Sequence, residues 1–397
     1  MKPSDHSSSS LRGALSGAAF LMATSAIGPG FLTQTATFTE QLKASFGFVI
    51  LISILLDIGA QLNIWRIVTV SELRAQDLAN KIFPGLGYVL AALIVSGGII
   101  FNIGNIAGCG LGLQILTGLS TKTGATISCI AALAIFWYRE AGKMMDLFTR
   151  VLGVIMIILT VYVAFVSGPP IITALHKTIL PDKIEVMKIV TLVGGTVGGY
   201  ISFAGAHRLL DAGVKGRSSV PVITKSAVSG ILITSVMRFI LFLAALGVVW
   251  HGVLLGNQNP AAEVFRSAAG KAGYIFFGIV LWCAAITSVV GASYTSVSFF
   301  KTFHPAIANK EKWIISLFII LSTVIFIFAG NPVTLLVLAG AFNGIILPIA
   351  LAVMLVAATR ATLVNQYKHP LWMHIIGWLV VITMSWMSII TIRANIS

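Results

Sequence analysis

Six consecutive residues, Gly194-Gly195-Thr196-Val197-Gly198-Gly199, interrupt an apolar stretch that extends from residue 188 to residue 212. A second interruption, Gly28-Pro29-Gly30, divides the apolar stretch 13–42. Unwound backbone inside a bilayer is costly unless it borders a cavity or a ligand. Two interruptions at corresponding places in the two halves of a chain therefore predict an inverted repeat, with a binding site between the broken helices near the middle of the membrane. Close packing of helices through small residues is the alternative explanation.

The composition of the chain agrees with a membrane location. Of its 397 residues, 57% are hydrophobic and 10% are charged, and the mean hydropathy is +0.98. Soluble domains average about 25% charged residues. We therefore predict an all-α membrane protein with about eleven transmembrane helices, each of which needs about 20 apolar residues. The predicted spans are 13–42, 47–70, 86–118, 123–138, 145–166, 188–212, 222–250, 273–303, 313–330, 334–358 and 371–392.

The spans and the charges together predict how the chain is organised. Most of the 26 Lys and Arg residues fall in segments that an inner N-terminus would place inside, as the positive-inside rule requires. We therefore expect a cytoplasmic N-terminus, in a bacterial-type plasma membrane, and we read the positive charge as a topology signal with no nucleic-acid role. The predicted segments are a cytoplasmic tail 1–12, a first repeat 13–166, an extracellular loop 167–187, a second repeat 188–358 and a final span 371–392.

Four segments carry a family resemblance. They are GAAFLMATSAIGPG at residues 17–30, Ala44-Ser45-Phe46-Gly47-Phe48, Asp77-Leu78-Ala79 and Gly194-Gly195-Thr196-Val197. In these segments, and in the order and length of its spans, the chain resembles the Nramp (natural resistance-associated macrophage protein) divalent-metal transporters. The resemblance implies a LeuT-type fold of two inverted five-helix repeats, with helices 1 and 6 broken. It also implies proton-coupled transport of a divalent metal cation such as Mn²⁺, Fe²⁺ or Mg²⁺.

The residues that bind metal in that family are replaced in this sequence. The Asp-Pro-Gly-Asn motif of the first broken helix aligns with Gly28-Pro29-Gly30-Phe31, which keeps the break and loses both side-chain ligands. The Met-Pro-His motif of the second aligns with Gly198-Gly199-Tyr200, without the methionine sulfur. The Asp and Glu of helix 3, which are linked with proton movement in that family, align with Asn102 and Asn105, whose amides release no proton at physiological pH. A divalent cation at the membrane centre needs anionic partners, so we expect the family's metal site to be lost.

Two acidic side chains, Glu40 and Asp57, remain in the first two spans. We assign them to gating or ion coupling, and they are the metal-ligand candidates if a metal is transported; no other metal ligand is assigned. Arg238, inside a span, needs a partner or a cavity, and Asp57 and Glu263 are the candidate partners.

A polar cluster is expected at the inner end of the sixth span. His207 and Asp211 are four residues apart, so that they share a helix face, and Arg208 follows His207 directly. We interpret the three as an inner gate or a proton-coupling group. An interfacial salt bridge with a snorkelling arginine is the alternative.

The breaks that remain suit a small carboxylate. A half-helix that begins at Gly28-Pro29-Gly30 directs unpaired N–H groups and its positive dipole end toward the cavity, and glycine allows close approach to the backbone. Nearby hydroxyls are those of Thr24, Ser25, Thr33 and Thr35. Candidate walls are Phe31, Tyr200 and Phe203, for which helix packing is the alternative. The candidate substrate-binding residues are Gly28, Pro29, Gly30, Phe31, Thr33, Gly195, Thr196, Gly198, Gly199, Tyr200, Asn102, Asn105 and Asn343.

Two functions follow from these observations. The first is secondary transport of a small organic anion or zwitterion, with H⁺ or Na⁺ as the coupling ion and no other cofactor. The alternative is proton-coupled transport of a divalent metal cation, as the resemblance implies. An enzyme is not expected, because the sequence contains no HExxH, GxSxG or P-loop motif. The expected partners are the substrate and the lipid bilayer, and Cys109, Cys129 and Cys283 are expected to be reduced core residues.

Overall fold

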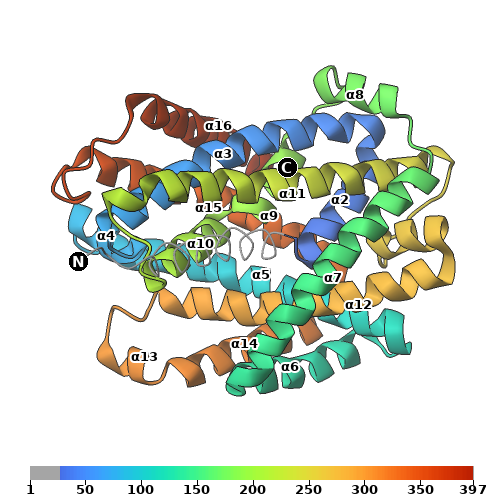
Figure 1. Cartoon of the computed structure of the whole chain (residues 1–397), viewed down its shortest axis with the longest axis horizontal. Coiled ribbons are helices and arrows are strands. Elements are labelled where there is room, and N and C mark those ends of the chain that lie inside the picture. Colours follow the sequence, from blue (N-terminus) through green and yellow to red (C-terminus); the bar gives the residue numbers. More distant parts are fainter. Residues whose placement is uncertain (1–26, 397) are drawn as a thin grey trace, which may run out of the picture.

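The computed structural model describes residues 27–396, which form helices joined by loops (Figure 1). The first half contains α2 (Pro29–Leu42), the 3₁₀ turn η1 (Lys43–Ser45), α3 (Phe46–Ser71), α4 (Ala75–Ile82), α5 (Leu86–Thr117), α6 (Thr121–Trp137), α7 (Arg139–Val166) and α8 (Ile171–Ile179). The second half contains α9 (Val186–Val197), α10 (Gly199–Asp211), η2 (Arg217–Ser219), α11 (Val220–Trp250), α12 (Pro260–Ser298), α13 (Pro305–Asn309), α14 (Glu311–Ala329), α15 (Pro332–Thr359) and α16 (Leu371–Ile396). The predicted tail 1–12, the first part of the span 13–42, and Thr24 and Ser25 lie outside the described residues.

The membrane spans agree with the prediction. Among the described residues, eight helical stretches are long and apolar enough to cross a membrane, or nine if α7 and α8, which are bent by 106°, count as one span. One of these stretches, Pro29–Ser71, includes both α2 and α3, and α6 is a shorter apolar helix. Each of the predicted spans therefore has a helical counterpart, with α2 representing the end of the first. The predicted boundary within the apolar run 313–359 is confirmed, because α14 ends at Ala329 and α15 begins at Pro332.

Glycine and proline set the two breaks. Gly198 is extended, with φ −48° and ψ 164°, and it separates α9 from α10 within one predicted span. Gly28, also extended, precedes α2, whose first residue is Pro29. Proline suits the first helical position because its missing N–H would lack a partner there in any case. The residues that precede α2 and α10 are Gly28 and Gly198. Glycine has no side chain, so the first N–H groups of both helices receive no hydrogen bond from a capping side chain.

The long helices run roughly side by side (Figure 1). In that view α3 and α16 lie along one edge of the bundle, α6 and α14 lie along the other, and α9, α10, α15 and α5 occupy the middle. Helices α4 and α13 lie at the left end, which we call the α4 end, and α8 lies at the right end, which we call the α8 end.

Small residues bring α9 and α15 together in the middle of the bundle. A methyl group at Gly194 would overlap the backbone oxygen of Gly340, and one at Gly344 would overlap the backbone oxygen of Val190. Glycine is needed at these positions because the two backbones touch. The small-residue packing that the sequence left open is therefore present, alongside a true break at Gly198. The three cysteines are buried and free, as predicted.

Candidate functional site

The starts of α2 and α10 are buried and are linked through α15. Phe31, in the first turn of α2, is 2% exposed, and Tyr200, in the first turn of α10, is 3% exposed. The Asn343 side chain on α15 accepts a long hydrogen bond from the Tyr200 backbone N–H (3.4 Å) and donates to the Gly97 carbonyl on α5 (3.0 Å). Asn343 thus holds the start of α10 against two other helices.

Gln34, one turn beyond Gly30, is a further polar residue at this junction that the sequence reasoning missed. Its Nε2 donates to the Leu336 carbonyl on α15 (3.0 Å), and its Oε1 is buried with no hydrogen-bond partner among the described residues. A methyl group at Gly195 would lie 2.6 Å from that oxygen. The spacing from Gly30 is i,i+4 and places Gln34 on the same helix face as Gly30, which is the signal that could have found it.

Arg238, near the middle of α11, contacts the end of α9 and the start of α2 at the same junction. Its guanidinium donates from Nη1 to the Thr196 hydroxyl at the end of α9 (2.7 Å), and its Cζ lies 4.2 Å from the centre of the Phe31 ring. The Asp57 carboxylate on α3 interacts electrostatically with it, although the two do not form a direct ion pair among the described residues. Of the two candidate partners, the structure brings Asp57 to Arg238, while Glu263 pairs with Arg266.

The two asparagines of α5 differ in their contacts. Asn102 donates to the hydroxyls of Ser293 on α12 (3.2 Å) and Ser322 on α14 (3.1 Å), so it joins three helices. Asn105 is 1% exposed, and its Nδ2 has no partner among the described residues. These contacts favour the helix-joining interpretation for Asn102 and leave Asn105 as a candidate polar contact.

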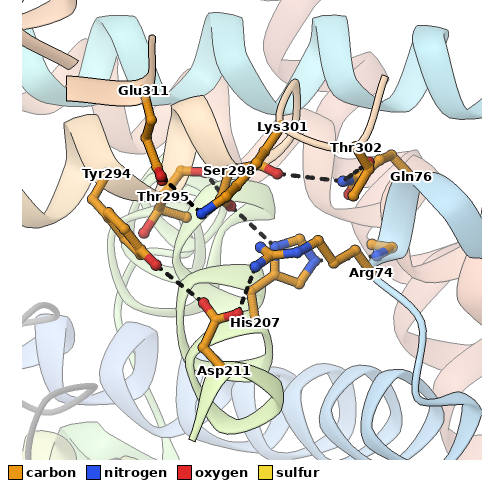
Figure 2. Close-up of polar contacts among 11 residues, drawn as sticks. Arg74, Gln76, His207, Asp211, Tyr294, Thr295, Ser298, Lys301, Thr302 and Glu311 are labelled. Atoms are coloured by element: carbon orange, nitrogen blue, oxygen red, sulfur yellow. Dashed lines mark hydrogen bonds and ion pairs between the residues drawn. The ribbon is translucent and has the colours of Figure 1, made fainter. Parts of the chain in front are cut away.

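A polar cluster closes the α4 end of the bundle (Figure 2). Asp211, the last residue of α10, pairs with Arg74 (2.5 Å) and accepts a hydrogen bond from the Tyr294 hydroxyl of α12 (3.1 Å). His207, one turn earlier, accepts from the Ala75 backbone N–H at the start of α4 (3.1 Å). His207 and Asp211 therefore bind different partners and do not bond to each other. Sequence reasoning missed Arg74 and Tyr294, which come from distant segments.

The same cluster ties α4 and the start of α14 to the turn that follows α12 (Figure 2). The Gln76 amide donates to the Thr302 hydroxyl (2.9 Å), and Lys301 pairs with Glu311 (2.8 Å). Burial raises the pKa of Asp77, in the first turn of α4, while its hydrogen bond with Thr302 acts in the opposite direction.

Three further predicted residues are Glu40, Arg208 and Phe203, and the Phe203 ring lies beside His207 of the α4-end cluster, with ring centres 6.0 Å apart. Glu40 accepts from the Leu255 backbone N–H (2.7 Å), so it fastens the end of α2 to the loop before α12. Arg208 is exposed. Phe203 packs against Phe299, with ring centres 5.7 Å apart, as the packing alternative predicted.

Comparisons with known proteins identify the family. The family model described as natural resistance-associated macrophage protein-like (Nramp) matches residues 19–394. The chain belongs to the Nramp family. Among its relatives, the uncharacterized membrane protein YcsG of Bacillus subtilis is 61% identical over 378 residues, which cover 95% of this chain and 94% of that protein.

Solved structures show the fold. A manganese transporter of Eremococcus coleocola matches with a TM-score of 0.73 and 17% identity, covering 100% of this chain and 89% of that one. MhsT, solved in complex with L-phenylalanine, matches with a TM-score of 0.61 and 18% identity, covering 95% of this chain and 97% of that one. The predicted LeuT-type fold is therefore confirmed, and this Nramp protein is a multi-pass membrane protein of a transporter family.

Proposed function

We propose that this Nramp protein is a secondary transporter of small organic anions or zwitterions, coupled to H⁺ or Na⁺. The observation that carries the proposal is the buried guanidinium of Arg238, which contacts Thr196 at the end of α9 and Phe31 at the start of α2. The N-terminal ends of α2 and α10 add positive dipole ends to the same junction. The guanidinium and these two helix N-termini stabilise an anionic group and repel a cation.

The metal alternative has less support from the same residues. Within residues 27–396 no group of three or more His, Cys, Asp and Glu side chains is placed to hold a metal ion. Asp57 interacts electrostatically with Arg238, and the positive charge of that guanidinium opposes the binding of a cation beside it. The structural neighbour from Eremococcus coleocola is a manganese transporter, so Mn²⁺ is the cation against which the proposal is tested.

The α4-end cluster is the proposed inner gate. Asp211, Arg74 and Tyr294 join α10, the loop before α4, and α12, and these segments have to separate if the junction is to open toward that end. We propose that the α4 end faces the cytoplasm of a bacterial-type plasma membrane, as the positive-inside rule indicates. Alternating access in this fold moves one group of helices against the other around a fixed site.

Uptake by proteoliposomes tests the proposal. Purified protein would be reconstituted and given radiolabelled pyruvate, L-lactate, L-alanine or Mn²⁺, under inward proton and sodium gradients and an inside-negative potential. We expect saturable, gradient-dependent uptake of at least one acid and no saturable Mn²⁺ uptake. Saturable Mn²⁺ uptake, with no uptake of any acid, would refute the proposed function.

Gly30 provides a variant that reports on the ligand. A methyl group there would meet Gln34 Nε2 and the Leu336 oxygen at 3.7 Å, which is ordinary contact, so the protein accommodates it. We expect Gly30→Ala to weaken acid uptake and Gly30→Val to weaken it further, because the added methyls occupy space beside the start of α2. Gly291→Ala is the matched control, since nothing lies within 4 Å of its added methyl. Equal uptake by all three variants and the wild type would place the substrate elsewhere.

A further inference from the structure

We propose that Arg238 binds the carboxylate of the transported substrate directly. The binding position is the side of the junction where the start of α2 faces the end of α9. The proposal rests on the proposed function and identifies the side chain that makes the site selective for an anion. From the sequence, Arg238 was expected only to need a partner or a cavity, and it was not among the candidate binding residues.

The position of Arg238 is the first observation. The residue is 2% exposed and lies near the middle of α11. Its Nη1 is held by the Thr196 hydroxyl (2.7 Å), which itself donates to the Leu192 carbonyl (2.8 Å). The face of its guanidinium is held by the Phe31 ring, 4.2 Å from Cζ. Two contacts from two different broken helices therefore fix the orientation of the group.

The unused donors are the second observation. A guanidinium carries five N–H donors in a planar fork that matches a carboxylate. Nε and Nη2 of Arg238 are buried and have no hydrogen-bond partner among the described residues. Nε and Nη2 lie on one edge of the guanidinium, which is the edge that forms paired hydrogen bonds with carboxylates. Buried donors of a charged group are rarely left unpaired, because the cost is high.

The state of Asp57 is the third observation. The Asp57 carboxyl interacts electrostatically with Arg238 without forming an ion pair with it, and its Oδ1 has no partner among the described residues. Asp57 therefore does not engage the free edge of the guanidinium. Phe31 lies in the first turn of α2, so the guanidinium is held by a side chain from the N-terminal end of that helix, the end that favours anions.

Variants of Arg238 test the assignment by transport kinetics. Uptake of radiolabelled pyruvate, L-lactate and L-alanine would be measured for the wild type, Arg238→Lys, Arg238→Gln and Thr196→Val. Arg238→Lys keeps the charge and loses the planar fork, and we expect its KM for the acid to rise at least tenfold, as the loss of a charge-assisted hydrogen bond implies. We expect no uptake by Arg238→Gln. We expect a KM about threefold to tenfold higher for Thr196→Val, which loses the charge-assisted hydrogen bond that orients the guanidinium but no direct contact of Arg238 with the substrate.

Arg266→Gln is the matched control. Its guanidinium also lies over an aromatic ring, 5.5 Å from the centre of Tyr274, but its side chain is 62% exposed. We expect its KM to stay within twofold of the wild type. Melting temperatures without substrate would show which variants are folded.

The outcomes separate the two proposals. A wild type that takes up none of the acids overturns the proposed function, and this inference with it. A wild type that takes up an acid, with an unchanged KM in folded Arg238→Lys, overturns the role of Arg238 and leaves the proposed function standing. If neither Arg238 variant folds, Thr196→Val decides, because an unchanged KM in that variant contradicts the expected threefold to tenfold rise and overturns the proposal.

Discussion

Removing the Asp211 carboxylate should open the α4 end of the bundle. Asp211→Ala abolishes the ion pair with Arg74 (2.5 Å) and the hydrogen bond from Tyr294 (3.1 Å). The Asp211 side chain is 35% exposed, so the ion pair is worth about 0.2–1 kcal/mol after screening by solvent. The hydrogen bond adds about 0.5–1.5 kcal/mol. Together they stabilise the closed arrangement by about 1–2 kcal/mol, and their loss should raise the open population about 5–30-fold.

Cysteine alkylation measures that population. Ser298, which is 1% exposed and contacts His207 (3.3 Å), lies behind the cluster and would be replaced, Ser298→Cys, in a background with the three native cysteines changed to alanine. When closing is fast, the rate of maleimide labelling follows the open population. We expect the rate to rise about 5–30-fold in Asp211→Ala. Asp182→Ala, which removes an exposed ion pair with Lys177 near α8, is the control. If Ser298→Cys is labelled at rates within twofold of each other with and without Asp211→Ala, the proposal that the α4-end cluster is a gate is refuted.

Two further predictions concern stability. Gly194→Ala should lower the melting temperature by several degrees, because its methyl overlaps the Gly340 oxygen and overpacking costs about 1–3 kcal/mol; Gly291→Ala, with open space around it, should leave the melting temperature nearly unchanged. Burial and neighbouring basic side chains lower the pKa of His369 to about 4, from an ordinary 6.5. Between pH 4 and pH 6.5 the unfolded protein therefore binds a proton at His369 that the folded protein does not bind. Stability should therefore be constant above pH 6.5 and fall as the pH drops toward 4, and His369→Gln should show a smaller fall in melting temperature between pH 7.5 and pH 5. An equal fall in both proteins would contradict this account.

The breaks and the spans could be predicted because local composition decides them. Long apolar runs have few structural choices in a bilayer, and Gly198 and Pro29 mark the two helix boundaries at the breaks. Helix α4 was not predicted, because its eight residues are amphipathic and fall between two spans. The helical hydrogen bonds of such a short segment depend on packing against neighbours that the sequence does not identify.

The site was only partly predictable, because its contacts join residues far apart in the chain. Gln34 bonds to Leu336, which lies 302 positions later in the sequence, and Arg74 bonds to Asp211, which lies 137 positions later. Helical periodicity identifies a face and gives no information on which helix covers it. For Arg238 the sequence showed the need for a partner but could not choose between Asp57 and Glu263, since that choice depends on the packing of α11 against α3.

Binding by the purified protein tests the central claim most directly. Isothermal titration calorimetry would compare pyruvate, L-lactate, L-alanine and Mn²⁺ in detergent, where no gradient or potential contributes. The account predicts saturable binding of at least one acid, weakened in Arg238→Lys, and no saturable binding of Mn²⁺. Saturable binding of Mn²⁺ with no binding of any acid would contradict it.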